Sequence, residues 1–355
     1  MSPVNPLIWH RHNEDWVWHV LDLNDNFVEE MSGVTGGSLK MDVAKEIRTG
    51  GSLNWTGAVK PDWLRMRVQP IYKATLIDGT EVEWRRGVYI PAAPKVTWTG
   101  DKAVVTVELY DKLLVLSEDK VDHTYSLAAG TVVTTALRTL IESAGETKHA
   151  IVDSTETLAT SMVWPIGTTK LRIANDLLAA INYFSLWCDS AGFYRGEPYV
   201  IPQKRGAAWD FLDGQECIYE PDFEDDNDYF GVPNKVILIS QGDGDTEGLV
   251  SVATNEDPDD ELSFNNRERW VTVVETGVEA TSQAILDELA QRRLESLSQV
   301  ASTITLKHAL VPLDLNNLVN FRRTPALLEF RAVVQEMTIP CVPGKLATAI
   351  IRKVK

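Results

Sequence analysis

The pentapeptide Thr-Gly-Gly-Ser-Leu occurs twice, at residues 35–39 and 49–53, and glycine pairs of this kind can cradle phosphate groups. A P-loop needs a glycine, four further residues and then Gly-Lys-Ser/Thr, but residues 36–40 have no second glycine directly before the lysine. Neither copy leads from a buried strand into a helix, whose first amides would bind the anion. Both pairs are therefore interpreted as bends from which the strands Ser38–Met41 and Ser52–Trp55 leave.

Metal-binding patterns are weak. Residues 243–248, Asp-Gly-Asp-Thr-Glu-Gly, resemble the start of a calcium loop, but its twelfth position is Thr254, where a bidentate glutamate is needed. A strand pattern follows instead of a helix, so a hairpin turn is favoured. The six histidines include no His-Glu-x-x-His, and His10 with His12 alone would be a weak metal pair. No metal site is predicted.

Signals of a catalytic nucleophile are equally weak. The chain has no Gly-x-Ser-x-Gly elbow, and no base partner is identifiable for Cys188. Cys188, Cys217 and Cys341 are too far apart for a disulfide framework and are predicted to be reduced and buried. Among 51 acidic residues, chance carboxylate pairs are plentiful, so a cell-wall hydrolase remains open on the acids alone. The sequence predicts no catalytic residue, no cofactor and no enzyme.

Eleven tryptophans raise the alternative of a carbohydrate-binding surface. Trp16, Trp18, Trp84 and Trp98 alternate within predicted strands, where aromatic side chains usually fill sheet faces. Packing in the core is therefore the favoured interpretation for these four residues.

Net charge is −17, and sixteen acids against the single base Lys235 place −15 of it within residues 213–262. Such a segment repels nucleic acid, which argues against a DNA-gripping module. No apolar run approaches the ~18–20 residues of a membrane span. The N-terminus lacks a basic region followed by an apolar stretch, so no secretory signal is predicted and folding in a cytoplasm is expected.

The elements that position these residues begin with closely spaced strands. Trp63–Val68 alternates apolar and charged residues like a half-buried strand. Asp78-Gly79, Gly100-Asp101 and Asn24-Asp25-Asn26 are predicted turns between strands. Together these patterns predict a barrel or sandwich over residues 10–118.

Helical spacing then predicts one helix capped by Thr131 and stopped by Gly145, and a second from Thr169. Strands return in the last third, with one helix over about residues 282–298. The fold class is therefore mainly β with an α+β insert. The predicted domains are a first β-barrel at 1–118, an α+β insert at 119–205 and a second β-barrel at 206–355. The last third supplies the strands 235–241, 249–254, 269–275, 302–308, 318–323, 327–339 and 345–353.

Several stretches resemble the hub, or tail-associated minor tail, proteins at the tail tip of long-tailed phages, especially those infecting actinobacteria. These stretches are Ile47–Trp55, Val107–Leu113, Tyr125–Val133, Leu177–Phe184 with Trp187–Gly192, and Asp226–Val236. The resemblance implies a fold similar to the contractile-phage baseplate hub, with two tube-like β-barrels and inserts. It brings no catalytic residue with it.

The same resemblance implies a structural role in the virion. It implies a trimeric ring at the tail tip, assembled in the host cytoplasm, that joins the tail tube to the tip. The distal tail or tube protein, the tape measure and other minor tail proteins would be partners, and DNA would pass through the lumen unbound. A carbohydrate-binding or receptor-binding tail protein is the alternative.

Two structural expectations follow. The two strand-rich parts should form β-barrels of related topology, and the hub interpretation would fail if both packed as one continuous sheet. Part of residues 213–262 should face the lumen or its rim, because carboxylate walls repel passing phosphates over about 10 Å.

Overall fold

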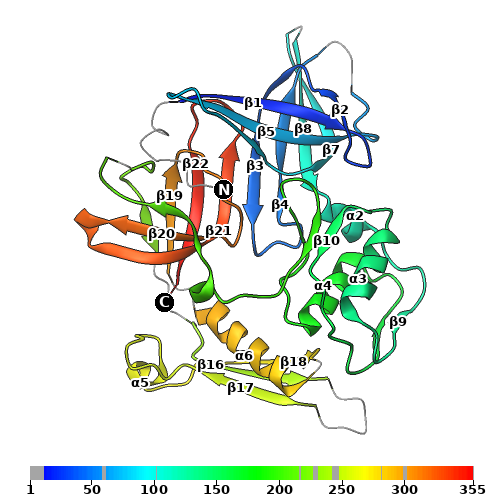
Figure 1. The fold of residues 1–355 in the computed structure, drawn as a ribbon, viewed down its shortest axis with the longest axis vertical. Helices are drawn as coiled ribbons and strands as arrows, with labels where there is room; N and C mark the ends of the chain where they lie inside the picture. Colours follow the sequence, from blue (N-terminus) through cyan, green and yellow to red (C-terminus); the bar gives the residue numbers. More distant parts are fainter. Residues whose placement is uncertain are drawn as a thin grey trace.

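The computed structural model describes residues 12–57, 61–100, 102–215, 217–226, 231–241, 248–280, 282–298 and 302–354 (Figure 1). It is mainly β, with 45% of residues in strands and 17% in helices. Most strands belong to one large sheet. They are β1 (His12–Leu21), β2 (Phe27–Glu30), β3 (Val34–Asp42), β4 (Thr49–Trp55), β5 (Arg67–Leu76), β6 (Glu81–Arg85), β7 (Tyr89–Thr99), β8 (Lys102–Asp111), β14 (Ala207–Phe211), β15 (Glu224–Asp226), β19 (Thr303–His308), β20 (Leu318–Arg323), β21 (Leu328–Pro340) and β22 (Ala347–Val354).

Hydrogen bonds connect the strands of both ends of the chain. The main path runs β15-β19-β22-β21-β3-β4-β8-β7-β5-β1-β2, and β3 pairs antiparallel with β21, with Lys40 opposite Thr338. One hydrophobic core follows the same path, from Leu53 in β4 to Phe321 in β20. The strand-rich parts therefore form a connected sheet of fourteen strands rather than two separate sheets. Figure 1 shows β1, β5, β7 and β8 curling on one side and β19–β22 on the other.

The glycine pairs lie inside β3 and β4, so the predicted strands are confirmed, but the glycines are not bends that precede them. The strands begin before the glycines, not after them. Gly51 has φ +154°, and a Cβ there would stand 2.0 Å from the carbonyl oxygen of Ser38. A Cβ on Gly37 would meet the carbonyl oxygen of Ser52 at 2.5 Å. The glycines let the two backbones approach each other closely.

Among the turn and strand predictions for the first third, one turn is confirmed and one strand is wrong. Asp78-Gly79 does turn the chain between β5 and β6, with Gly79 at φ +83° and its N–H donating to the Leu76 carbonyl at 2.9 Å. The predicted strand at Trp63–Val68 is wrong, since β5 begins only at Arg67. Asp62 holds a turn there by accepting from the Leu64 N–H, and Leu64 is 89% exposed.

The insert has its own core. It contains α2 (Leu113–Glu118), α3 (Val133–Glu142), α4 (Lys170–Ala180), β9 (Tyr125–Leu127), β10 (His149–Ile151), β11 (Met162–Trp164), β12 (Trp187–Cys188) and β13 (Tyr194–Gly196). The helix predicted from Thr169 is confirmed as α4, and Thr169 caps it with its side chain accepting from the Arg172 N–H at 3.1 Å. Thr131 does not cap α3, because its hydroxyl donates to the Ala128 carbonyl and Val132 holds the cap position.

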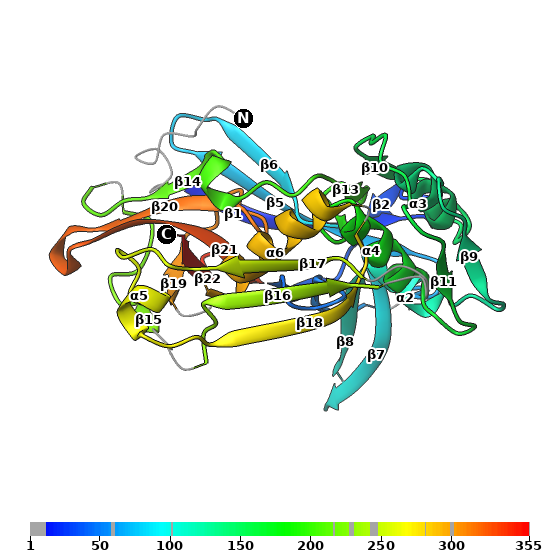
Figure 2. The same ribbon diagram turned by 90° about the horizontal axis from the view of Figure 1, so that it is seen from below.

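Along the chain, a third group of elements interrupts the strands of the last third. β16 (Lys235–Ser240) lies between β17 (Val250–Thr254) and β18 (Thr272–Val278), and a short α5 (Phe264–Arg267) connects the latter two. The helix predicted near 282–298 is confirmed as α6 (Gln283–Ser298). Its buried residues Leu286, Ala290 and Leu294 pack on one face of this sheet. Figure 2 shows the three strands, β16, β17 and β18, with α6 beside them. None of the described helices is long and apolar enough to cross a membrane.

Candidate functional site

The described residues do not support metal binding by the weak sequence patterns noted above. Residues 242–247, which hold most of the calcium-like segment, lie outside the described residues, as does His10. His19, His123, His149 and His308 belong to separate elements. Among described residues, no group of three or more histidines, cysteines and acids is placed to hold a metal ion.

The three cysteines are free thiols, as predicted. Cys341 is buried, and burial raises the pKa of its thiol to about 12. Cys188 and Cys217 are half-buried instead of buried. Burial is also the largest cause that raises the pKa of Cys188 well above its ordinary value. Since the thiolate is the nucleophilic form, neither Cys188 nor Cys341 is activated for chemistry.

The tryptophans divide between core and surface. Trp18 and Trp84 are buried in the main core, and Trp16 packs edge-on against Tyr72 at 5.4 Å. The prediction of core packing is wrong for Trp98, which is 69% exposed on the β7–β8 hairpin. That hairpin projects from the rest of the molecule in Figure 2, so the side chain has no sheet face to cover it.

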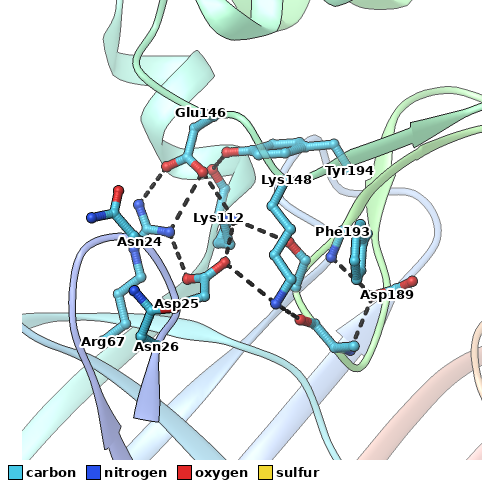
Figure 3. A network of polar contacts seen from close by, with 12 residues as sticks. Asn24, Asp25, Asn26, Arg67, Lys112, Glu146, Lys148, Asp189, Phe193 and Tyr194 are labelled. Atoms are coloured by element: carbon cyan, nitrogen blue, oxygen red, sulfur yellow. Dashed lines mark hydrogen bonds and ion pairs between the residues drawn. The ribbon is translucent and has the colours of Figure 1, made fainter. Parts of the chain in front are cut away.

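A buried ion cluster lies where the first strands meet the insert (Figure 3). It consists of Asp25, Arg67, Lys112, Glu146 and Lys148. The Lys112 ammonium lies 2.7 Å from Asp25 and 2.9 Å from Glu146, and the Arg67 guanidinium lies 2.7 Å from Asp25 and also binds Glu146. The Lys112 side chain is 0% exposed and that of Asp25 is 1% exposed. Asp25, Arg67, Lys112 and Glu146 are thus paired inside the protein, while Lys148, 28% exposed, lies at the edge of the cluster.

Local structure explains how the ion cluster forms. Asp25 sits in the tight β1–β2 turn at φ +63°, which points its carboxylate at the start of β5 and the residue before α2. Lys112 also donates to the Gly192 carbonyl at 3.0 Å, and Lys148 donates to the Ala191 carbonyl at 2.6 Å. Burial works to lower the pKa of Arg67, but hydrogen bonds to the two carboxylates raise it overall. The cluster therefore fixes the insert to the first strands, and its groups are not free for catalysis.

A cavity of about 400 Å³ lies beside this junction. Its wall includes Arg48 from the β3–β4 connection, Arg205, Phe184 and the carboxylate of Asp111. Asp111 accepts hydrogen bonds from the Thr49 hydroxyl at 2.9 Å and from the Leu113 N–H at 2.8 Å. Burial raises the pKa of Asp111 to about 6. Because its oxygens already accept from the protein, Asp111 is a structural acid here.

The acidic segment is divided between paired and unpaired carboxylates. Asp213 accepts from the Thr324 N–H at 2.7 Å, Asp225 binds Lys353 at 2.9 Å, and Glu220 lies 3.6 Å from Lys307. Seven further described acids of the segment are exposed and make no ion pair with a described residue. These exposed acids are Asp222, Glu224, Asp226, Glu256, Asp257, Asp259 and Glu261.

The sequence reasoning missed the ion cluster, whose members are spread from residue 25 to residue 148. Only the turn at Asn24–Asn26 was recognised, and that pattern carries no information on what Asp25 contacts. The cavity was missed too, since Arg48, Phe184 and Arg205 come from three distant loops.

Comparison with known proteins finds no matching family model and no matching curated protein. Solved structures do match along the whole chain. A tail protein from Neisseria meningitidis superposes with a TM-score of 0.68 at 12% identity, covering 96% of this chain and 97% of that one. A 43 kDa prophage tail protein from Shewanella oneidensis gives 0.63 at 12% identity, covering 95% and 98%. A prophage tail protein from Listeria monocytogenes gives 0.57 at 12% identity, covering 96% and 95%. The fold is therefore that of phage tail proteins.

Proposed function

We propose that the chain is a structural hub of a phage tail tip, located in the virion. Three copies form a ring that joins the tail tube to the tip and leaves a channel for DNA and the tape measure. The observation that carries this proposal is the likeness to tail proteins over at least 95% of both chains, which includes the insert as well as the sheet. The distal tail protein, the tape measure and other minor tail proteins are the proposed partners, and assembly takes place in the host cytoplasm.

Uncovered strands and apolar side chains support self-association. β2 and β15 are the edge strands at the two ends of the main path of the large sheet. β17 and β18 are the edge strands of the smaller sheet formed by β17, β16 and β18. Free strand edges are normally covered in an assembly. The outer face of the smaller sheet also exposes Val250, Val252 and Val274, each by more than half. A ring in which each half of the connected sheet acts as a tube-like barrel unit would cover edges of this kind between copies.

No catalytic role is proposed, and the exposed carboxylates are assigned a passive role. Asp222, Glu224 and Asp226 flank or form β15 and are exposed. We place this part of the acidic segment at the channel or its rim, where carboxylates repel DNA phosphates within about 10 Å at ~0.1 M salt. The domain boundaries near residues 118 and 205 belong to the same proposal.

Exposed Trp98 gives a test of the assembly. The variant Trp98→Ser is expected to incorporate at least about tenfold less well into tails, because buried tryptophans often dominate interfaces. Its free energy of unfolding should stay within ~0.5 kcal/mol of wild type, since the side chain covers little of the fold. Mass spectrometry of purified virions measures incorporation, and Leu327→Ser, also at an exposed site, is the control. Wild-type incorporation of the Trp98 variant would contradict this contact, and absence of the unmodified chain from virions would contradict the proposed function.

A further inference from the structure

Four arginines from separate parts of the chain lie near one another, and three of them surround Tyr199. They are Arg48 between β3 and β4, Arg205 after β13, Arg292 on α6 and Arg352 on β22, and we call them the arginine cluster. The Arg292 guanidinium lies 4.1 Å from the Tyr199 ring centre and that of Arg205 lies 5.5 Å from it. Two members, Arg48 and Arg205, line the cavity of about 400 Å³.

The charges of the arginine cluster are poorly compensated inside the chain. Among the described residues, none of the four forms an ion pair with a carboxylate. Arg205 and Arg292 donate to carbonyl and amide oxygens instead, at Val200, Asn316, Tyr183 and Asn182. The Arg48 side chain makes no hydrogen bond with a described residue, and the nearby Asp111 is already bonded to Thr49 and Leu113.

The pKa shifts of the four arginines agree with their lack of carboxylate partners. Burial is the largest cause that lowers the pKa of each of the four arginines, and it brings the pKa of Arg292 to about 10. Arg48 and Arg205 both contribute repulsion at Arg292. An anion placed among them would offset burial and repulsion together. Arginine forks bind carboxylates with two parallel hydrogen bonds, which favours a carboxylate ligand.

The remaining carboxylates in the cavity wall do not pair with the arginine cluster. Glu197 binds Arg195, and Asp189 accepts from the Ala191 and Phe193 N–H groups of its own turn. Asp314 lies 3.8 Å from Arg86 and is half exposed. These three acids of the cavity wall are therefore engaged by other partners and form no ion pair with Arg48 or Arg205.

A rigid acidic loop lies elsewhere on the same chain, at residues 255–261. It exposes Glu256, Asp257, Asp259 and Glu261, which make no ion pair with a described residue. Side-chain amides hold its backbone, since Asn266 donates to the carbonyls of residues 258 and 260 at 2.8 Å each. The Phe264 N–H donates to the carbonyl of residue 255 at 2.9 Å, so the ends of the loop meet.

We propose that the arginine cluster and its cavity bind the carboxylates of the acidic loop of a second copy of this chain. Charge complementarity carries the choice of occupant: two guanidiniums of the cluster line the cavity, none of the four forms an ion pair with a described carboxylate, and four exposed carboxylates stand on one loop. The inference rests on the self-association in the proposed function, for which it names a contact. It leaves Asp222, Glu224 and Asp226 free to face the channel.

The test uses the full chain and a cyclic peptide. Residues 254–265 are synthesised with an added cysteine at each end and closed by a disulfide, which reproduces the meeting of the loop ends. Binding is measured by fluorescence anisotropy in about 50 mM salt, where the screening of charges is weak. The peptide should bind the wild-type chain. A peptide with Asn and Gln in place of the acids should bind at least about tenfold more weakly, because hydrogen bonds to charged groups are lost.

Variants locate the contact. Arg48→Gln should weaken peptide binding about tenfold while leaving thermal unfolding unchanged, since the Arg48 side chain makes no hydrogen bond within the described chain. Arg205→Gln should weaken it similarly. Arg172→Gln, on the exposed side of α4 beside Asp176, is the matched control and should bind like wild type.

Three results would overturn the proposal. They are no binding of the acidic peptide, equal binding of the neutral peptide, and equal binding by Arg48→Gln and wild type. Inorganic phosphate that saturates the site at the same concentration as the peptide would make it a small-anion site instead and would also overturn it. Failure of the tail-tip proposal is seen separately, as absence of the chain from purified virions.

Discussion

Lys112→Met is expected to lower the free energy of unfolding by about 4 kcal/mol, the cost typical of removing one partner from a buried ion pair. Methionine fills a similar volume but carries no charge. Asp25 and Glu146 would keep Arg67 and lose the ammonium at 2.7 Å and 2.9 Å. Two buried carboxylates would then share Arg67, with only Lys148 at 3.9 Å from Asp25 besides it, and the Gly192 carbonyl would lose its donor. Urea unfolding followed by tryptophan fluorescence measures the change.

A surface lysine provides the control for that experiment. Lys73→Met removes an exposed pair, 3.6 Å from Glu83, and should cost less than about 1 kcal/mol. If Lys112→Met were as mild as Lys73→Met, the ion cluster would not be the connection that fixes the insert to the first strands. The comparison separates loss of a buried charge from loss of a lysine in general.

Gly51→Ala is expected to destabilise the fold by about 3 kcal/mol, at the upper end of overpacking effects. A Cβ at this position would stand 2.0 Å from the Ser38 carbonyl oxygen and 3.0 Å from the Leu39 Cα, and both are backbone atoms of the paired strand. The φ of +154° adds strain for any residue with a side chain. The β3–β4 pair would have to separate, and β3 also carries the pairing with β21 that connects the two ends of the chain.

Gly206→Ala is the matched control, since a Cβ there meets no atom within 4 Å and no special backbone angle is required. It should change the free energy of unfolding by less than ~0.5 kcal/mol. Thermal unfolding of the two variants side by side makes the comparison. Equal stability of both variants would mean that β3 and β4 can tolerate a side chain, and that the repeated glycines have no packing role.

Local signals predicted local structure well. Thr169 caps α4 because its hydroxyl competes for a free amide at the first turn, which depends only on neighbouring residues. Asp78-Gly79 turns the chain for an equally local reason. Trp63–Val68 failed because alternation of residue types does not reveal that Asp62 and Leu64 form a turn. Trp98 failed because a projecting hairpin has the same alternation as a buried one.

Long-range arrangements could not be predicted. The ion cluster needs Asp25 and Glu146 to meet across more than a hundred residues, and no spacing rule encodes such a contact. The connection of both ends through β3 and β21 is of the same kind. A connected sheet was expected to argue against a hub. That criterion was too strict, because the sheet belongs to a fold that superposes on tail proteins over almost the whole chain.

A cryo-electron microscopy map of the assembled tail tests the central claim most directly. The account predicts three copies of this chain around the axis at the tip, directly below the tail tube, with Asp222, Glu224 and Asp226 toward the channel. One copy or six copies at the tip would contradict the threefold ring. Density for this chain elsewhere in the particle, or none in the tail, would contradict the hub itself.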